Sequence, residues 1–212
     1  MARRNILALI FVIIFAHCTR DIPIEYRISA AWLAYPAEPP IIQEAAEAWN
    51  KATCLEMFRF AGYSNDRTFN LDDLQDGQLV IYPLWQKENA DANKVSELDY
   101  TGYSIADILI KRSYIYASAN YRWHFLYHHP EAEMYPREYY FKLLKSVVAH
   151  ELGHQLLRPV FGHNSDEVGY SIMNPSPDSP YSAYLPTKLD VDQLCSIYNC
   201  PPAKECPTRP TF

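Results

Sequence analysis

The sequence lacks several features that would assign it to common functional classes. Its 212 residues contain no Gly-x-Ser-x-Gly elbow and no phosphate-cradling glycine-rich loop, which excludes the usual serine hydrolases and nucleotide-binding proteins. Basic residues are fewer than acidic ones, 19 against 25, so the chain has no electrostatic footprint for nucleic acid. Internal repeats are also absent. What remains is a globular composition, 49% hydrophobic and 14% aromatic, sufficient for one domain with its own core.

The first 18 residues have the layout of a secretory signal peptide. Arg3 and Arg4 precede an apolar run over residues 6–16, which is about half as long as a bilayer-spanning helix, and no second long apolar run follows. Two alternatives stay open at the processing point: removal of the segment, or retention of Cys18 as the lipidated cysteine of a lipoprotein. We therefore expect an exported protein, either secreted or periplasmic, with no transmembrane helix.

Four further cysteines predict a disulfide framework. An even number of cysteines in an exported chain favours two bridges, but three connectivities are possible and the sequence does not choose among them. The four residues are Cys54, Cys195, Cys200 and Cys206. Three of them lie close to the end of the chain, where residues 201–212 form a tail rich in Cys and Pro.

The chain between the signal segment and this tail, residues 19–200, predicts an α+β domain rather than an alternating parallel sheet. Alternating and β-rich runs predict strands over residues 22–28, 55–60, 78–82 and 106–110, the last of which could continue to 116. Helical spacing predicts helices over residues 41–52, 139–157 and 187–198. Thr187 is the candidate N-cap of the last helix, with Asp190 at the capping-box position.

The string HELGH in the longest expected helix carries the strongest chemical signal. Residues four apart lie above one another on a helix, so His150 and His154 can share one zinc ion. Glu151 lies beside the first histidine, where a carboxylate can accept the proton of a metal-activated water. A catalytic zinc needs a third protein ligand, and His163 is the candidate on a segment that Pro159 directs out of the helix.

The stretch HELGHQLLRPVFGHNSDEVGYSIMNP resembles the metzincin metalloproteases, and within them the matrixin-like branch. The order of the expected elements is similar as well, and the resemblance covers about residues 22–200. It implies that His150, His154 and His163 are the zinc ligands and that Glu151 is the general base. It also implies a twisted mixed sheet of four to five strands, with Met173 in a turn beneath the metal.

One departure from the family pattern concerns the third ligand. The family usually has Gly three residues after the second histidine and its third histidine three residues further on, where this chain has Leu157 and Val160. His163 therefore requires three additional residues in the turn, and Gly162 could supply the permissive backbone. Asp166 is the alternative ligand, because carboxylate oxygen also binds zinc.

Other candidate metal sites are weaker. One group lacks an accompanying Glu and is more typical of an aromatic surface loop than of a second zinc site: His124, His128 and His129. Another lacks EF-hand spacing and is more typical of a solvated acidic turn than of a calcium site: Asp72, Asp73 and Asp76. We therefore expect one catalytic zinc ion, with calcium or a second zinc unsupported.

These patterns predict a secreted zinc endopeptidase that acts on a protein or peptide substrate. By resemblance, an extended substrate would lie along an edge strand near residues 100–104, and Tyr181 and Tyr184 either line its side-chain pocket or lie on the surface. Two alternatives are a catalytically silent binding protein of the same fold and a zinc hydrolase of small peptides. Too few residues separate Cys18 from the first strand for a pro-segment with a zinc-capping cysteine, so we expect no activating cleavage. The oligomeric state stays open.

Overall fold

The computed structural model describes most of the expected domain. The described residues are 21–65, 79–84, 102–107, 112–118, 137–156, 163–164, 169–174 and 183–211. Several residues named above lie outside these ranges: Cys18 with the rest of the signal segment, Asp72, Asp73, Asp76, His124, His128, His129, Leu157, Pro159, Val160, Gly162, Asp166 and Tyr181. Within the described ranges, no helix combines the length and apolar character needed to cross a membrane.

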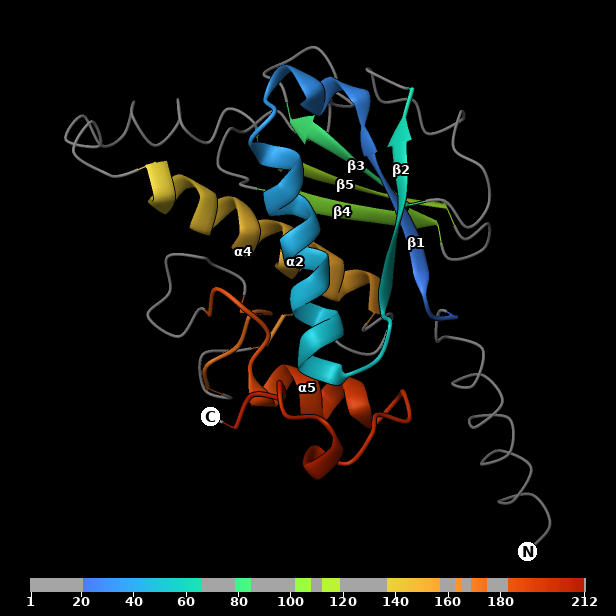
Figure 1. Cartoon of the computed structure of the whole chain (residues 1–212), viewed down its shortest axis with the longest axis vertical. Coiled ribbons are helices and arrows are strands. Elements are labelled where there is room, and N and C mark those ends of the chain that lie inside the picture. Colours follow the sequence, from blue (N-terminus) through green and yellow to red (C-terminus); the bar gives the residue numbers. More distant parts are fainter. Residues whose placement is uncertain are drawn as a thin grey trace, which may run out of the picture.

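One five-stranded sheet forms the framework of the fold (Figure 1). Its strands are β1 (Ile24–Ser29), β2 (Phe58–Ser64), β3 (Leu79–Leu84), β4 (Gly102–Asp107) and β5 (Arg112–Ser118). Their order across the sheet is β2-β1-β3-β5-β4. The pairs β1 with β2, β1 with β3 and β3 with β5 are parallel, whereas β4 pairs with β5 in antiparallel register at one edge.

Three α-helices accompany the sheet: α2 (Glu38–Thr53), α4 (Arg137–Leu156) and α5 (Lys188–Cys195). Two short 3-10 helices, η1 (Ala30–Ala34) and η5 (Ala203–Glu205), complete the described elements. Figure 1 shows α4 crossing behind α2, and α5 lies near the end of α2. The result is a mixed α/β fold, in agreement with the expected combination of a sheet, a long helix and a C-terminal helix.

The core lies between the sheet and the two longer helices. Side chains of β1 alternate, and Ile24, Tyr26 and Ile28 are buried on the helix-facing side. In α2 the apolar spacing expected from the sequence is buried, and Trp49 is fully enclosed. The indole Nε1 of Trp49 donates a hydrogen bond to the carbonyl oxygen of Ala149 in α4 at 2.8 Å, which joins the two helices at their crossing.

The strands add two details to what the sequence predicts. The sheet is mixed, because β4 and β5 are antiparallel, but the other three strand pairs are parallel. The crossover through α2 places β2 beside β1 in parallel orientation. Of the strand expected over residues 106–110, Ala106 and Asp107 belong to β4, and residues 108–110 lie outside the described ranges. Asp107 pairs with Arg112, the first residue of β5, in antiparallel register. A short apolar run has no period that separates a strand centre from the connection between two strands.

The strand after α2 also begins later than expected, at Phe58 rather than at residue 55. Cys54 adopts a left-handed conformation with φ 55°, which ends the helix. Asn50 then binds the chain that follows: its Oδ1 accepts hydrogen bonds from the N–H groups of Met57 and Phe58, at 2.8 and 2.9 Å. The residues between helix and strand therefore belong to a turn that Asn50 stabilises.

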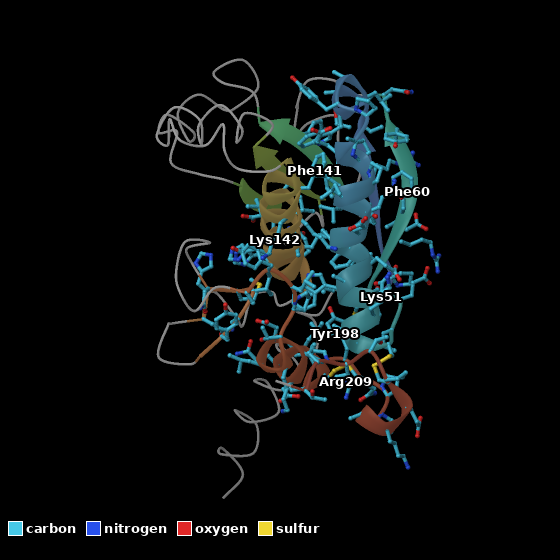
Figure 2. The ribbon with its side chains drawn as sticks, turned by 60° about the vertical axis from the view of Figure 1, so that its left-hand side comes forward. Lys51, Phe60, Phe141, Lys142, Tyr198 and Arg209 are labelled. Carbon is cyan, nitrogen blue, oxygen red and sulfur yellow. A yellow bond between two sulfur atoms is a disulfide. The ribbon has the colours of Figure 1, made fainter. Side chains whose placement is uncertain are left out.

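The structure resolves the disulfide connectivity that the sequence left open. Cys54 is bonded to Cys206, 152 residues away, and Cys195 is bonded to Cys200, five residues away. The longer bridge holds the C-terminal segment against the end of α2, where Thr208 Oγ1 also donates to the carbonyl oxygen of Lys51. Figure 2 shows Lys51 and Arg209 at this junction.

We predict that the longer bridge contributes more stability than the shorter one. Chain entropy lost in the unfolded state grows with the length of the closed loop, and loops of 152 and 5 residues differ by about 3 kcal/mol on this account. In urea without reductant, the Cys54→Ala/Cys206→Ala variant should therefore unfold at a lower concentration than Cys195→Ala/Cys200→Ala. Equal losses of unfolding free energy in the two variants would contradict this prediction.

Candidate metal centre

Helix α4 positions the two histidines of the HELGH string. The buried side chains Leu144, Val148, Leu152 and Leu156 form the stripe that fixes the helix against the core. Relative to this stripe, His150 and His154 lie one above the other on a partly exposed face. The local sequence thus anchors one face of the helix and leaves the imidazoles at the boundary with solvent.

His163 completes a triangle of ring nitrogens with these two residues. The Nε2 atoms of His150 and His154 are 3.2 Å apart, those of His154 and His163 are 3.3 Å apart, and those of His163 and His150 are 3.2 Å apart. Among the described residues, this is the one group of three His, Cys, Asp or Glu side chains close enough to hold a metal ion. The sequence-predicted ligand set is therefore brought together, although His163 lies nine positions after His154.

The dimensions of this triangle fit zinc. Two nitrogen ligands each about 2.0–2.1 Å from a tetrahedral zinc ion lie about 3.3–3.4 Å from one another. The observed separations of 3.2–3.3 Å match this value along all three edges. His163 is exposed, so the triangle faces solvent on one side. Three imidazoles with an accessible face are the donor set of a catalytic zinc site, which keeps one coordination position for water or substrate.

A backbone carbonyl sets the orientation of His150. Its Nδ1 lies 2.6 Å from the carbonyl oxygen of Ile172, and because a carbonyl only accepts hydrogen bonds, Nδ1 carries the proton. Nε2 of the neutral ring then has a free lone pair directed at the other two histidines. Such a partner on the far nitrogen is the usual arrangement for a metal-binding histidine.

Burial favours the neutral form of His150 and His163, which is the form that binds metal. It lowers the pKa of His150 from 6.5 to about 4, and the hydrogen bond to Ile172 only partly opposes this effect. Burial also lowers the pKa of His163, although its ring is more exposed. At neutral pH both rings therefore present a lone pair rather than a second N–H.

Met173, which the resemblance assigns to a turn beneath the metal, lies against α4 at Gly153. Residues 171–174 are buried, and the side chain of Met173 is fully enclosed. A Cβ atom added at Gly153 would lie 2.3 Å from Met173 Sδ and 3.0 Å from Trp49 Cζ2. Gly153 thus allows the turn and α2 to approach the helix between the two histidines, a role that the sequence analysis missed although the glycine stands inside the motif.

Glu151 follows His150 on α4 and is buried, with 5% of its surface exposed. A buried carboxylate is uncommon in proteins without a structural or chemical role. One helical residue advances the side chain by about 100°, so Glu151 projects from α4 on a neighbouring face to the histidines. The expected general base is thus adjacent to the nitrogen triangle in sequence and on the same helix.

The pocket residues expected from the resemblance are described in part. Tyr184 is partly buried, and Lys142 Nζ of α4 lies 3.7 Å from the centroid of its ring, which is a cation–π contact. Ser146 Oγ, one turn further along α4, donates to the carbonyl oxygen of Ala183 at 3.4 Å. Ala183 and Tyr184 therefore lie against α4 just ahead of the histidines.

No protein-family model matches this chain, and the search of curated proteins found no matching sequence. The function proposed below rests on the chemistry and geometry of the site.

Substitution of Gly153 by alanine should destabilise the protein through Met173. The added Cβ would meet the Met173 sulfur at 2.3 Å, and overpacking of this kind costs about 1–3 kcal/mol, more than the gain of about 1 kcal/mol from alanine's helix propensity. In a Met173→Ala background the main obstacle is absent, so the same change should cost less. A double-mutant cycle from urea unfolding measures the difference, and an identical cost in both backgrounds would refute the contact.

The metal-free protein should lose stability as the pH falls below 6.5. His150 has a folded-state pKa of about 4, whereas an unfolded histidine titrates near 6.5, so protons bind preferentially to the unfolded chain between these values. The expected loss between about pH 7 and 5 is about 2 kcal/mol. His150→Asn keeps a donor for Ile172 but does not titrate, and its unfolding free energy should fall by correspondingly less in urea titrations at the two pH values.

Proposed function

We propose that this protein is an exported zinc-dependent endopeptidase with a metzincin-like fold of the matrixin-like branch. The observation that carries the proposal is the triangle of three Nε2 atoms, 3.2–3.3 Å apart, on the HELGH helix and His163. The order of elements supports it: a first strand β1, a helix α2 that bears Trp49, a strand β5 ahead of α4, and the closing helix α5. Two disulfides support an oxidising compartment.

A zinc ion at this site would act as a Lewis acid toward a substrate carbonyl and would acidify a water molecule. His150, His154 and His163 would hold it, with His150 oriented by the carbonyl oxygen of Ile172. In this mechanism Glu151 accepts a proton from the attacking water and later donates it to the amine that leaves. The hydrolysis requires no covalent intermediate with a side chain.

The sheet offers a surface for an extended peptide. β4 is the last strand in the sheet order and pairs with β5 on one side only within the described residues. Helix α4, which carries the histidines, packs against β4 and β5. An edge strand can bind a peptide through backbone hydrogen bonds, and its position beside α4 would bring the peptide backbone to the metal.

The expected result for Glu151→Gln is retention of zinc with loss of hydrolysis. Gln preserves the volume of the side chain but cannot accept the proton, and loss of a general base typically costs about 10²–10⁴-fold in rate. Elemental analysis should give about one zinc ion per chain in both wild type and this variant. Cleavage of a denatured protein substrate, with and without a chelator, measures the activity.

Two further variants complete this experiment. His163→Ala should lower the zinc content, because it removes one of the three donors. Glu47→Gln makes the same chemical change as Glu151→Gln on the exposed face of α2 and should retain full activity. Hydrolysis by Glu151→Gln would exclude the proposed base. Zinc without hydrolysis in wild type would favour a silent binding protein, and cleavage confined to short peptides would favour a small-substrate hydrolase.

A further inference from the structure

Asp190 is a fully buried carboxylate that does not belong to the histidine triangle. It lies in the first turn of α5 and has 0% of its surface exposed. Its Oδ2 accepts hydrogen bonds from the N–H of Ile172 at 3.0 Å and from the N–H of Thr187 at 2.7 Å. Its Oδ1 accepts the hydroxyl proton of Ser171. The carboxylate thus caps its own helix and at the same time binds the turn that contains Met173.

The Ser171 hydroxyl extends this network with a defined direction. It donates to Asp190, and it accepts from the N–H of Met173 at 2.9 Å and from Nδ2 of Asn164 at 2.7 Å. A hydroxyl has one proton and two lone pairs, so all three are in use. The direction of every bond then follows from the carboxylate, which can only accept.

Two short routes lead from this network to the histidines. Ile172 donates its N–H to Asp190, and its own carbonyl oxygen accepts the proton of His150 Nδ1 at 2.6 Å. Asn164, the residue after His163, donates its backbone N–H to the carbonyl oxygen of Met173 at 2.9 Å. Helix α5 also holds the side chain of Asn164, because Gln193 Nε2 donates a hydrogen bond to Asn164 Oδ1 at 3.0 Å. Both histidines are thus fixed by backbone that α5 anchors.

We propose that Asp190 is a positioning residue of the metal centre, which acts through the Ser171–Met173 turn to hold His150 in its Nδ1-protonated form and to place His163. The inference deepens the proposed zinc site and rests on it where metal affinity is concerned. The orientation of His150 in the metal-free protein is a separate consequence that does not depend on catalysis.

The chemistry requires a carboxylate at this position rather than an amide. If the asparagine of an Asp190→Asn variant kept its oxygen toward the N–H groups of Ile172 and Thr187, its NH₂ group would face Ser171 Oγ. That oxygen already accepts two hydrogen bonds, so a third donor has no acceptor there. The opposite orientation places NH₂ against two backbone N–H groups. Either arrangement displaces the turn that holds the Ile172 carbonyl.

The test compares Asp190→Asn with Asp192→Asn in the full chain. Asp192 is on the same helix but is exposed and pairs with Lys188, so its substitution makes the same charge change outside the network. Changes in the partners of metal-binding histidines typically cost about 10–100-fold in affinity, and we expect about a tenfold weaker affinity for Zn²⁺ in Asp190→Asn. Chelator competition measures the affinity, and the absorption spectrum of the Co²⁺-substituted protein reports ligand geometry.

Nitrogen-15 NMR of histidine-labelled, metal-free protein supplies the second readout. Wild type should show His150 as the Nδ1–H tautomer, and Asp190→Asn should show a mixture with the Nε2–H form. A general loss of stability does not by itself change a tautomer in the folded state. Thr187→Val provides the matched stability control, because it removes a hydroxyl that contacts Asp190 Oδ2 and the carbonyl oxygen of Tyr170 but leaves the Ser171–Met173 turn bonded to Asp190.

Ser171→Ala keeps the experiment decisive if Asp190→Asn does not fold, because it breaks the same route one step closer to the histidines. It should weaken Zn²⁺ binding and mix the tautomers as well. Wild-type affinity and tautomer in both variants would overturn the inference. Failure of wild type to bind Zn²⁺ would instead reject the proposed function, and the tautomer measurement would still decide whether Asp190 orients His150.

Discussion

The site depends on how closely α4 approaches its neighbours at the two residues that precede the helical histidines. Ala149 receives the indole hydrogen bond of Trp49, and Gly153 admits the sulfur of Met173. Both residues lie on the buried side of the helix, and the next residue in each case is a histidine of the triangle. Because successive side chains are about 100° apart, fixing residues 149 and 153 against the core fixes the direction in which His150 and His154 project. Packing in the core therefore determines the positions of the two helical histidines of the candidate metal centre.

This arrangement has an energetic cost that a metal ion would offset. The three Nε2–Nε2 contacts of 3.2–3.3 Å cannot all be hydrogen bonds at once, since His150 Nε2 has no proton to give. The depressed pKa of His150 also removes protonation as a means of relief at neutral pH. Metal binding would supply a partner for the Nε2 lone pair of His150, so its free energy would also stabilise the fold. A preorganised, electron-rich triangle is consistent with a site that binds zinc tightly.

The parts of this site that were predictable from sequence are those that a local period determines. His150 and His154 share a helix face by spacing alone, and the buried stripe of α4 follows from the same period. The capping interaction of Asp190 with Thr187 was also predictable, because it spans three residues. The second role of Asp190 was not, since the Ser171–Met173 turn reaches it only through tertiary folding. The Cys54–Cys206 disulfide and the antiparallel pairing of β4 with β5 could not be predicted either, because both form only through tertiary folding.

Residues that follow His163, rather than the segment that precedes it, determine where this histidine lies. The segment between the second and third histidines has nine residue steps here and six in the family pattern, and loop closure over the longer segment costs only about 0.4 kcal/mol more. A longer segment would make the position of His163 less precise if α4 alone determined that position. His163 is instead followed by Asn164, whose backbone and side chain bind Met173, Ser171 and Gln193. A residue anchored from its C-terminal side tolerates a longer approach from its N-terminal side, so three residues more than the family pattern has are compatible with the observed triangle.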